Sequence, residues 1–291
     1  NFSVVATDVE TQRSTQAFSI TITFSDPYWN YTTLLLNGET PVTSFITDAS
    51  TNNFNSTIAG DTRPTLVTPY QNGYYSVYTS TGGYQQQFTS SYAIPSGTES
   101  FTVEFWFYKT SIWNSNSGFY TFIGTSTTGS FQIYYNNVDN AITVGTTGVS
   151  TIIQTTVTTI SLSTWHHLAV TRNVNSWTLW LDGVSRTTAT DSRSMTVPAT
   201  NGAIGNSADI YISNLRIIRG QALFTGAFTP ATSPLTATTV GSTGAGAAAS
   251  ISGAVSLLCS QSSRYLDNSP NNVAITVNAS ISTQPLIQTF N

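Results

Sequence analysis

The stretch TWHHLAVTRNVNSWTLWLDG, residues 164–183, contains the only two histidines of the chain, side by side. Successive side chains of a strand point to opposite faces, so His166 and His167 cannot bind one metal ion together. The turn NVNS then leads into a second alternating run, which ends at Asp182-Gly183, a dipeptide typical of a type I′ turn. The stretch therefore predicts a β-hairpin in which both histidines are structural, one packed and hydrogen-bonded and one near the sheet surface.

The composition predicts an all-β protein. Short alternating runs rich in Val, Ile, Thr, Tyr, Phe and Trp recur throughout the 291 residues, separated by Gly, Asn, Asp and Ser, and no long helical pattern interrupts them. Charged residues make up only 8% of the chain, against about 25% in an average soluble protein. Neutral polar surfaces of this kind suit a protein packed in a crowded, immobile assembly better than a freely diffusing enzyme.

Several classes of partner and site are disfavoured. The net charge is −4 and Lys109 is the only lysine, so the basic patch that nucleic acid requires is missing. The single cysteine, Cys259, excludes an intrachain disulfide and a cysteine-based zinc site. No apolar run approaches the ~18 residues needed to span a bilayer. Because the chain starts without Met or a signal peptide, we expect residue 1 to lie inside a longer polypeptide.

The pattern of strands and linkers divides the chain into four parts. Residues 1–26 contain a predicted hairpin and resemble the last strands of an immunoglobulin- or cadherin-like module. Residues 27–236 continue without a linker and form one domain, in which SFTVEFWFYKT becomes apolar on both faces, as expected in the middle of a sandwich. Residues 237–255 are rich in Gly, Ala, Ser and Thr, which predicts a flexible loop. Residues 256–291 form a final β segment.

That final segment repeats a pattern from the start of the domain. FITDASTNNF (45–54) and RYLDNSPNNV (264–273) share Asp-x-Ser-x-Asn-Asn. Asp, Ser and Asn side chains bind nearby backbone N–H groups, so one tight turn built twice is favoured over two ligand sites.

A glycosidase is the natural enzyme alternative for an aromatic-rich sandwich, and it needs two carboxylates about 5–9 Å apart. Glu104 is alone on its predicted strand, and Glu99 falls on the opposite face. The sequence therefore predicts no catalytic residue.

Aromatic and amide residues in predicted loops are the candidates for ligand binding. Trp113, Tyr134, Tyr135 and Asn137 combine rings that stack on sugars with groups that bind hydroxyls. Packing in the core or between subunits is the alternative and the favoured reading, because exposed aromatics also mark protein contacts.

Two loops, NNVDN and GNSAD, also offer oxygen ligands for calcium through Asp139 and Asp209. Asp and Asn are common turn residues, so a structural role is favoured, and no other cofactor is expected.

The hairpin at 164–183 resembles that of concanavalin A-like, laminin G-type jelly-roll domains, in which Trp-x-His-[apolar]-Ala-[apolar]-x-Arg precedes an apolar strand closed by Asp-Gly. FTVEFWFY (101–108) is similar to the central strand of these domains. The C-terminal segment SLLCSQSSRYLDNSPNNVAITVNASISTQPL (256–286) is similar to one that follows this domain in structural proteins of marine bacteriophages and cyanophages.

This resemblance implies a two-sheet antiparallel jelly roll preceded by an immunoglobulin-like repeat. It further implies a non-enzymatic phage virion protein, such as a tail fiber, spike or capsid decoration, at the particle surface. The expected partners are other virion proteins and further copies of the chain, with a trimer favoured, and a host-surface glycan is the expected ligand. The alternative is a carbohydrate-binding module of a bacterial secreted or cell-surface protein.

Overall fold

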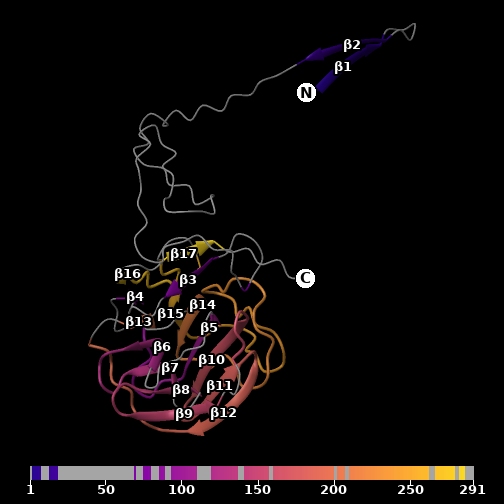
Figure 1. Ribbon diagram of the computed structural model, residues 1–291. Helices are drawn as coiled ribbons and strands as arrows, with labels where there is room; N and C mark the ends of the chain where they lie inside the picture. Colours follow the sequence, from indigo (N-terminus) through magenta and orange to yellow (C-terminus); the bar gives the residue numbers. More distant parts are fainter. Residues whose placement is uncertain are drawn as a thin grey trace. The chain divides into compact units, whose positions relative to one another are not determined.

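A computed structural model divides the chain into two units, residues 1–58 and 59–291, of which Figure 1 shows the strands. The structure describes residues 2–7, 13–18, 69, 75–79, 85–88, 93–109, 119–136, 141–156, 160–199, 202–206, 210–261, 266–278 and 282–285. In the first unit, β1 (Phe2–Thr7) pairs antiparallel with β2 (Arg13–Phe18). This pairing agrees with the predicted N-terminal hairpin, while its assignment to an immunoglobulin-like repeat stays a prediction.

Two antiparallel sheets build the second unit. The larger has the order β12-β11-β10-β5-β14-β3-β17, with β15 also paired to β14. Its strands are β3 (Tyr75–Thr79), β5 (Phe101–Lys109), β10 (Trp165–Asn173), β11 (Ser176–Leu181), β12 (Val184–Thr190), β14 (Ile210–Arg219), β15 (Ala254–Cys259) and β17 (Ser282–Pro285). The smaller has the order β16-β4-β13-β6-β7-β8-β9. Its strands are β4 (Gln85–Phe88), β6 (Phe119–Thr125), β7 (Phe131–Asn136), β8 (Ala141–Thr146), β9 (Ser150–Thr156), β13 (Gly202–Asn206) and β16 (Ile275–Asn278).

The described residues contain no helix, so the predicted all-β, two-sheet antiparallel sandwich is confirmed. The C-terminal segment belongs to it, because β15 and β17 extend the larger sheet and β16 extends the smaller one. The turns and edges of this sandwich place the side chains considered below.

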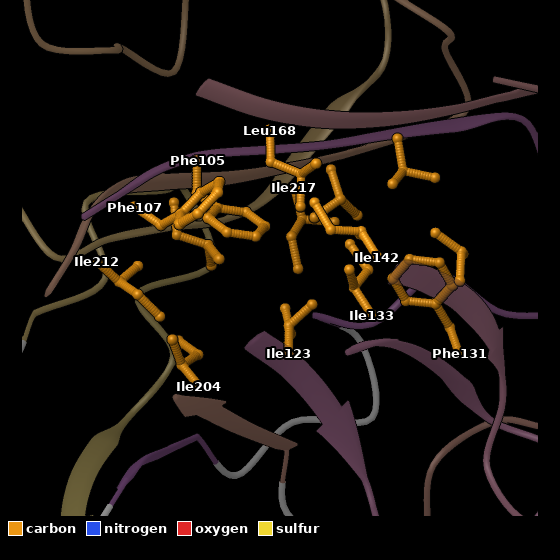
Figure 2. Close-up of a cluster of buried hydrophobic side chains, with 14 of the residues drawn as sticks. Phe105, Phe107, Ile123, Phe131, Ile133, Ile142, Leu168, Ile204, Ile212 and Ile217 are labelled. Carbon is orange, nitrogen blue, oxygen red and sulfur yellow. The ribbon is translucent and has the colours of Figure 1, made fainter. Parts of the chain in front are cut away.

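The main core lies between the sheets, where alternate residues of each strand face inward. Figure 2 shows these side chains meeting from both layers: Phe105, Phe107, Leu168, Ile212 and Ile217 from the larger sheet, and Ile123, Phe131, Ile133, Ile142 and Ile204 from the smaller. All of them are fully buried. Each such side chain stabilises the fold by about 1.5–3 kcal/mol relative to exposure, so this layer is the main source of stability.

The opposite face of the larger sheet is covered by the segment 220–253, which we call the strap. Trp180 and Ala169 of the sheet pack there against strap residues including Phe224, Phe228, Leu223, Leu235 and Val240. The rings of Phe224 and Phe228 stack with centroids 3.7 Å apart. Backbone bonds between Thr229 and Thr243 tie the strap to itself. Residues 237–255, predicted as a flexible loop, therefore contribute buried side chains to a second apolar cluster.

The stretch that predicts the fold forms the expected hairpin. β10 pairs with β11 from Leu168↔Leu181 to Asn173↔Ser176. Asp182 and Gly183 both have positive φ, 55° and 77°, as a type I′ turn requires, and they connect β11 to β12. The pairing of β10 with β5 on its other side places the hairpin between β12 and β5 of the larger sheet.

Candidate functional site

A hollow of about 440 Å³ lies on the smaller sheet, on the face turned away from the core. On β7 the side chains of Phe131, Ile133 and Tyr135 face the core, so Gln132 and Tyr134 point to the opposite side. Both are partly exposed. The hollow is lined by Gln132, Tyr134, Thr146, Gly148, Val149, Ser150 and Thr151, which are contributed by β7, β8, β9 and the turn between the last two.

The register of three neighbouring strands sets the floor of this hollow. Gln132 on β7 lies opposite Gly145 on β8, which lies opposite Thr151 on β9. A Cβ atom on Gly145 would lie 2.6 Å from the carbonyl oxygen of Ser150, closer than real contacts allow. Glycine therefore lets β8 and β9 approach each other with no side chain between Gln132 and Thr151.

The β8–β9 turn forms the upper rim. Its backbone is closed by the N–H of Val149, which donates to the carbonyl of Thr146 at 3.1 Å. The hydroxyl of Thr147 donates to the carbonyl of Thr125 at 3.0 Å, and its oxygen lies 3.3 Å from Oε1 of Gln132. The turn thus contacts the amide of Gln132, while Val149 stays 62% exposed at its tip.

Arg193 secures the start of β9 from outside the hollow. Its guanidinium donates to the carbonyl and hydroxyl of Ser150 and to the carbonyl of Thr151. The same group binds the carboxylate of Asp191, with Nε 2.9 Å from each oxygen. The hydrogen bond from Arg193 lowers the pKa of Asp191 below its usual range, against a smaller opposing effect of burial. The positive charge beside the rim is therefore already paired.

The chemistry of the lining is that of a neutral polar site with one aromatic ring. Gln132 brings an amide, Ser150 and Thr151 bring hydroxyl and backbone groups, and Tyr134 brings the ring. The volume falls within the about 300–1,000 Å³ typical of small-molecule sites. Such a set can pack on the apolar face of a sugar and hydrogen-bond to its hydroxyls.

Of the residues predicted for ligand binding, the structure brings Tyr134 to the hollow and turns its neighbour away. Tyr135 is 4% exposed and packs in the core, with Nζ of Lys109 5.3 Å from its ring centroid. Strand alternation separates the pair, so Tyr135 has a packing role here. The other candidates, Trp113, Asn137, Asp139 and Asp209, lie outside the described residues.

Sequence reasoning missed Gln132 and the β9 residues Ser150 and Thr151. The signal that could have found Gln132 is its spacing of two from Tyr134, which puts both on one face of a strand. For Ser150 and Thr151 only the Thr-Gly turn before them hints at a rim, because their position depends on pairing with β8.

The two histidines occupy separate environments, as the strand period predicts. Nδ1 of His166 lies 2.8 Å from Oδ2 of Asp182, whose other oxygen accepts the backbone N–H of His167 at 2.8 Å. Burial raises the pKa of Asp182, but the hydrogen bonds from His166 and His167 outweigh it and leave this pKa lowered. The imidazole of His167 is fully buried on the other face, with Nε2 3.3 Å from Oε2 of Glu104. Within the described residues no group of three His, Cys, Asp or Glu side chains could hold a metal ion.

Glu104 is the only acidic residue of β5, and its partners lie on the neighbouring strands. Its carboxylate accepts from Arg216 on β14 and faces His167 on β10, with all three side chains fully buried. Glu99 instead pairs with Arg219, whose Nε lies 2.8 Å from Oε1. Neither acid is arranged as one of two carboxylates flanking an open site.

The second copy of the repeated Asp-x-Ser-x-Asn-Asn pattern is a turn that binds its own backbone. Asp267 accepts the N–H groups of Leu258, Ser269 and Val273 at 2.7–2.9 Å. This agrees with the favoured structural reading for residues 266–273, whereas residues 264–265 and the first copy at 45–54 lie outside the described residues.

The sequence profile of a laminin G-type family, described as the concanavalin A-like lectin/glucanases superfamily, matches residues 80–228. This match covers half of the chain, including β5, the hollow and the histidine hairpin. The chain belongs to the concanavalin A-like lectin/glucanases superfamily. The predicted laminin G-type domain is thereby confirmed.

Solved structures with a similar fold include two that are described as carbohydrate-binding and a toxin binding domain. A candidate carbohydrate-binding protein from Bacteroides ovatus is 12% identical, with 83% of this chain and 67% of that one covered and a TM-score of 0.47. The carbohydrate-binding module CBM66 from Bacillus subtilis is 15% identical, with 50% and 96% covered and a TM-score of 0.35. The botulinum neurotoxin serotype D binding domain is 15% identical, with 66% and 48% covered and a TM-score of 0.42.

This chain thus spans about half the length of the toxin domain. Similarities of this size concern the fold alone and carry no argument about function. No curated protein matches this member of the superfamily. In the part of the chain that the structure describes, no helix has the length and apolar character needed to cross a membrane.

Proposed function

We propose that this member of the superfamily is a carbohydrate-binding module. The observation that carries the proposal is the hollow beside Tyr134, where a partly exposed ring and neutral hydrogen-bonding groups share one face of a lectin-type sandwich. The parent protein is then a bacterial secreted or cell-surface protein that uses the module to attach to a glycan. This was the alternative interpretation of the sequence, and the superfamily supports it better than it supports a virion role.

The module is proposed to bind without cleaving. Every carboxylate in the described residues is engaged by the chain itself: Glu99 with Arg219, Glu104 with Arg216, Asp182 with His166, Asp191 with Arg193, and Asp267 with backbone N–H groups. Hydrolysis of a glycosidic bond needs one acid that can give a proton and a second that assists, both facing the substrate. The described acids support binding over catalysis because their oxygens already face partners in the fold.

The test is a screen of residues 1–291 by affinity electrophoresis in gels containing dextran, mannan, xylan or galactan. Retardation by at least one polysaccharide is expected, and the same samples should release no reducing sugar. Normal mobility in every gel would contradict the binding role. Release of reducing sugar that is lost on changing one carboxylate would contradict the non-catalytic one.

A packing role in a virion is the second candidate, favoured by the low charge content of the chain. We propose it with its associated expectations: location at the particle surface, other virion proteins as partners, a homo-oligomer such as a trimer, and a preceding immunoglobulin-like repeat. Mass spectrometry of purified phage particles tests this candidate. Absence of this protein from the particles would rule out the virion role. Multiple copies on one particle would also strengthen weak glycan contacts through avidity.

A further inference from the structure

We infer that the hollow beside Tyr134 takes an uncharged sugar and binds it without a bridging metal ion. This inference rests on the proposed function and specifies its ligand class. It starts from the lining, in which every described residue is neutral: Gln132, Tyr134, Thr146, Gly148, Val149, Ser150 and Thr151. A carboxylate or sulfate that enters such a site loses water and gains no opposite charge, which is costly.

Among the described residues, Arg193 is a cation that hydrogen-bonds to the lining residues Ser150 and Thr151, and the chain itself already pairs its charge. Arg193 places Nη2 2.6 Å from Oδ2 of Asp191 and Nε 2.9 Å from both carboxylate oxygens. Its Nη groups donate further to the carbonyls of Ser150 and Thr151. The guanidinium has five N–H donors in a fixed plane, and the chain already occupies both of its edges. Arg193 therefore holds the start of β9 in place, and because its charge is paired with Asp191 it adds no net positive charge to the site.

A metal-bridged mode of binding does not fit the same residues. Calcium takes 6–8 oxygen ligands in proteins, with carboxylates prominent among them. The described residues of the lining include no Asp or Glu, and the nearby carboxylate of Asp191 is held by Arg193. Direct hydrogen bonds from Gln132 and the β9 groups, together with packing on the ring of Tyr134, are the contacts that this hollow offers.

The experiment compares neutral polysaccharides with anionic ones on residues 1–291. Dextran is matched with dextran sulfate, and xylan and mannan are set beside alginate and polygalacturonate, each with and without EDTA. The ionic strength is varied from about 0.01 M to about 1 M, which shortens the screening length from about 30 Å to about 3 Å. We expect binding to at least one neutral polymer, with a dissociation constant that changes less than about twofold with salt or EDTA.

The outcomes distinguish failure of the proposed ligand class from failure of the glycan-binding role. Binding restricted to anionic polymers, or binding lost in EDTA, overturns the ligand class and leaves the glycan-binding role standing. Binding to no polymer removes the glycan-binding role itself.

A charge-release variant tests the pairing of Arg193 directly. Asp191→Asn removes the counter-charge, so we expect a gain of dextran sulfate binding that disappears at high salt. Glu99→Gln is the matched control, because it releases Arg219 from a similar ion pair on the larger sheet. Equal gains in both variants, or no gain in Asp191→Asn, would contradict the assignment of Arg193 as a neutralised residue of the rim.

Discussion

Arg216 on β14 donates to one oxygen of Glu104 on β5 through both Nε, at 2.9 Å, and Nη2, at 2.6 Å, and neither side chain reaches solvent. The remaining donors of Arg216 bind strap carbonyls, those of Thr236, Thr239 and Val240. One ion pair thereby joins two central strands and holds the strap against the sheet. The buried charge of Arg216 is tolerated because both edges of its guanidinium group have hydrogen-bond acceptors.

Loss of this carboxylate should destabilise the sandwich strongly. Glu104→Gln leaves the charge of Arg216 buried without a counter-charge, and we expect the free energy of unfolding to fall by about 3–5 kcal/mol. Urea denaturation followed by tryptophan fluorescence measures it. Glu99→Gln, at the partly exposed pair with Arg219, should cost less than about 1 kcal/mol. Equal losses in the two variants would mean that the buried pair has no special role.

The same carboxylate should make stability depend on pH. Burial raises the pKa of Glu104, but the charge of Arg216 and the nearby imidazole of His167, with Nε2 3.3 Å from Oε2, act together against it and hold the pKa below 4.5. The native state thus favours the ionised form, so its contribution is present above about pH 4.5 and is lost as pH falls through the lower native pKa. Urea unfolding at a series of acidic pH values should show a shallower decline for Glu104→Gln than for the wild type. Parallel declines would refute the assignment.

The adjacent histidines should differ in their effect on stability. His167→Ala removes a fully buried ring that contacts Glu104, Trp106 and Phe228, and we expect a loss of about 2–4 kcal/mol. His166→Ala removes a ring that is 12% exposed and paired with Asp182, and should cost about 1 kcal/mol. Thermal and urea unfolding give both values. Zinc or EDTA should leave the wild-type melting temperature unchanged, and a shift with either would revive a metal site.

The β10–β11 turn contains a removable strain. Val174 has φ 57°, a left-handed conformation that a β-branched residue rarely adopts, and its side chain is exposed. Val174→Gly should therefore raise the free energy of unfolding by about 1 kcal/mol, measured by urea denaturation. The contrasting variant is Gly183→Ala, whose Cβ would collide with the carbonyl oxygen of Phe228 and should destabilise the fold. A loss of stability in Val174→Gly would show that the valine side chain matters more than the strain.

Local patterns predicted the hairpin well, because strand alternation and the Asp182-Gly183 turn depend on neighbouring residues alone. The apolar end of β5 also indicated a strand inside the sandwich, although Trp106 and Tyr108 stay partly exposed while the polar Thr102 and Glu104 are buried. The partner of Glu104 could not be predicted, since Arg216 lies 112 residues away and meets it only through the pairing of β5 with β14. Small residues at 237–255 suggested flexibility, whereas the contacts of this stretch with Arg216 on β14 and with Thr229 of the strap depend on residues outside it.

The candidate site was predictable only in part for a related reason. Alternation requires Tyr134 and Tyr135 to face opposite ways, yet sequence does not say which faces the core. The hollow also depends on Gly145 and on an irregular register between β8 and β9, which bring Ser150 and Thr151 of β9 to the same hollow as Gln132 and Tyr134 of β7, across β8. Such cross-strand relationships appear only once the sheet is assembled.

The most direct measurement is the dissociation constant of the bound neutral polysaccharide, determined by isothermal titration calorimetry for the wild type, Tyr134→Ala and Tyr75→Ala. Tyr75 is a partly exposed tyrosine on β3 of the larger sheet, a strand that contributes no residue to the lining of the hollow. We expect Tyr134→Ala to weaken binding at least about tenfold, which is about 1.4 kcal/mol, and Tyr75→Ala to bind like the wild type. Unchanged affinity in a folded Tyr134→Ala variant would contradict it.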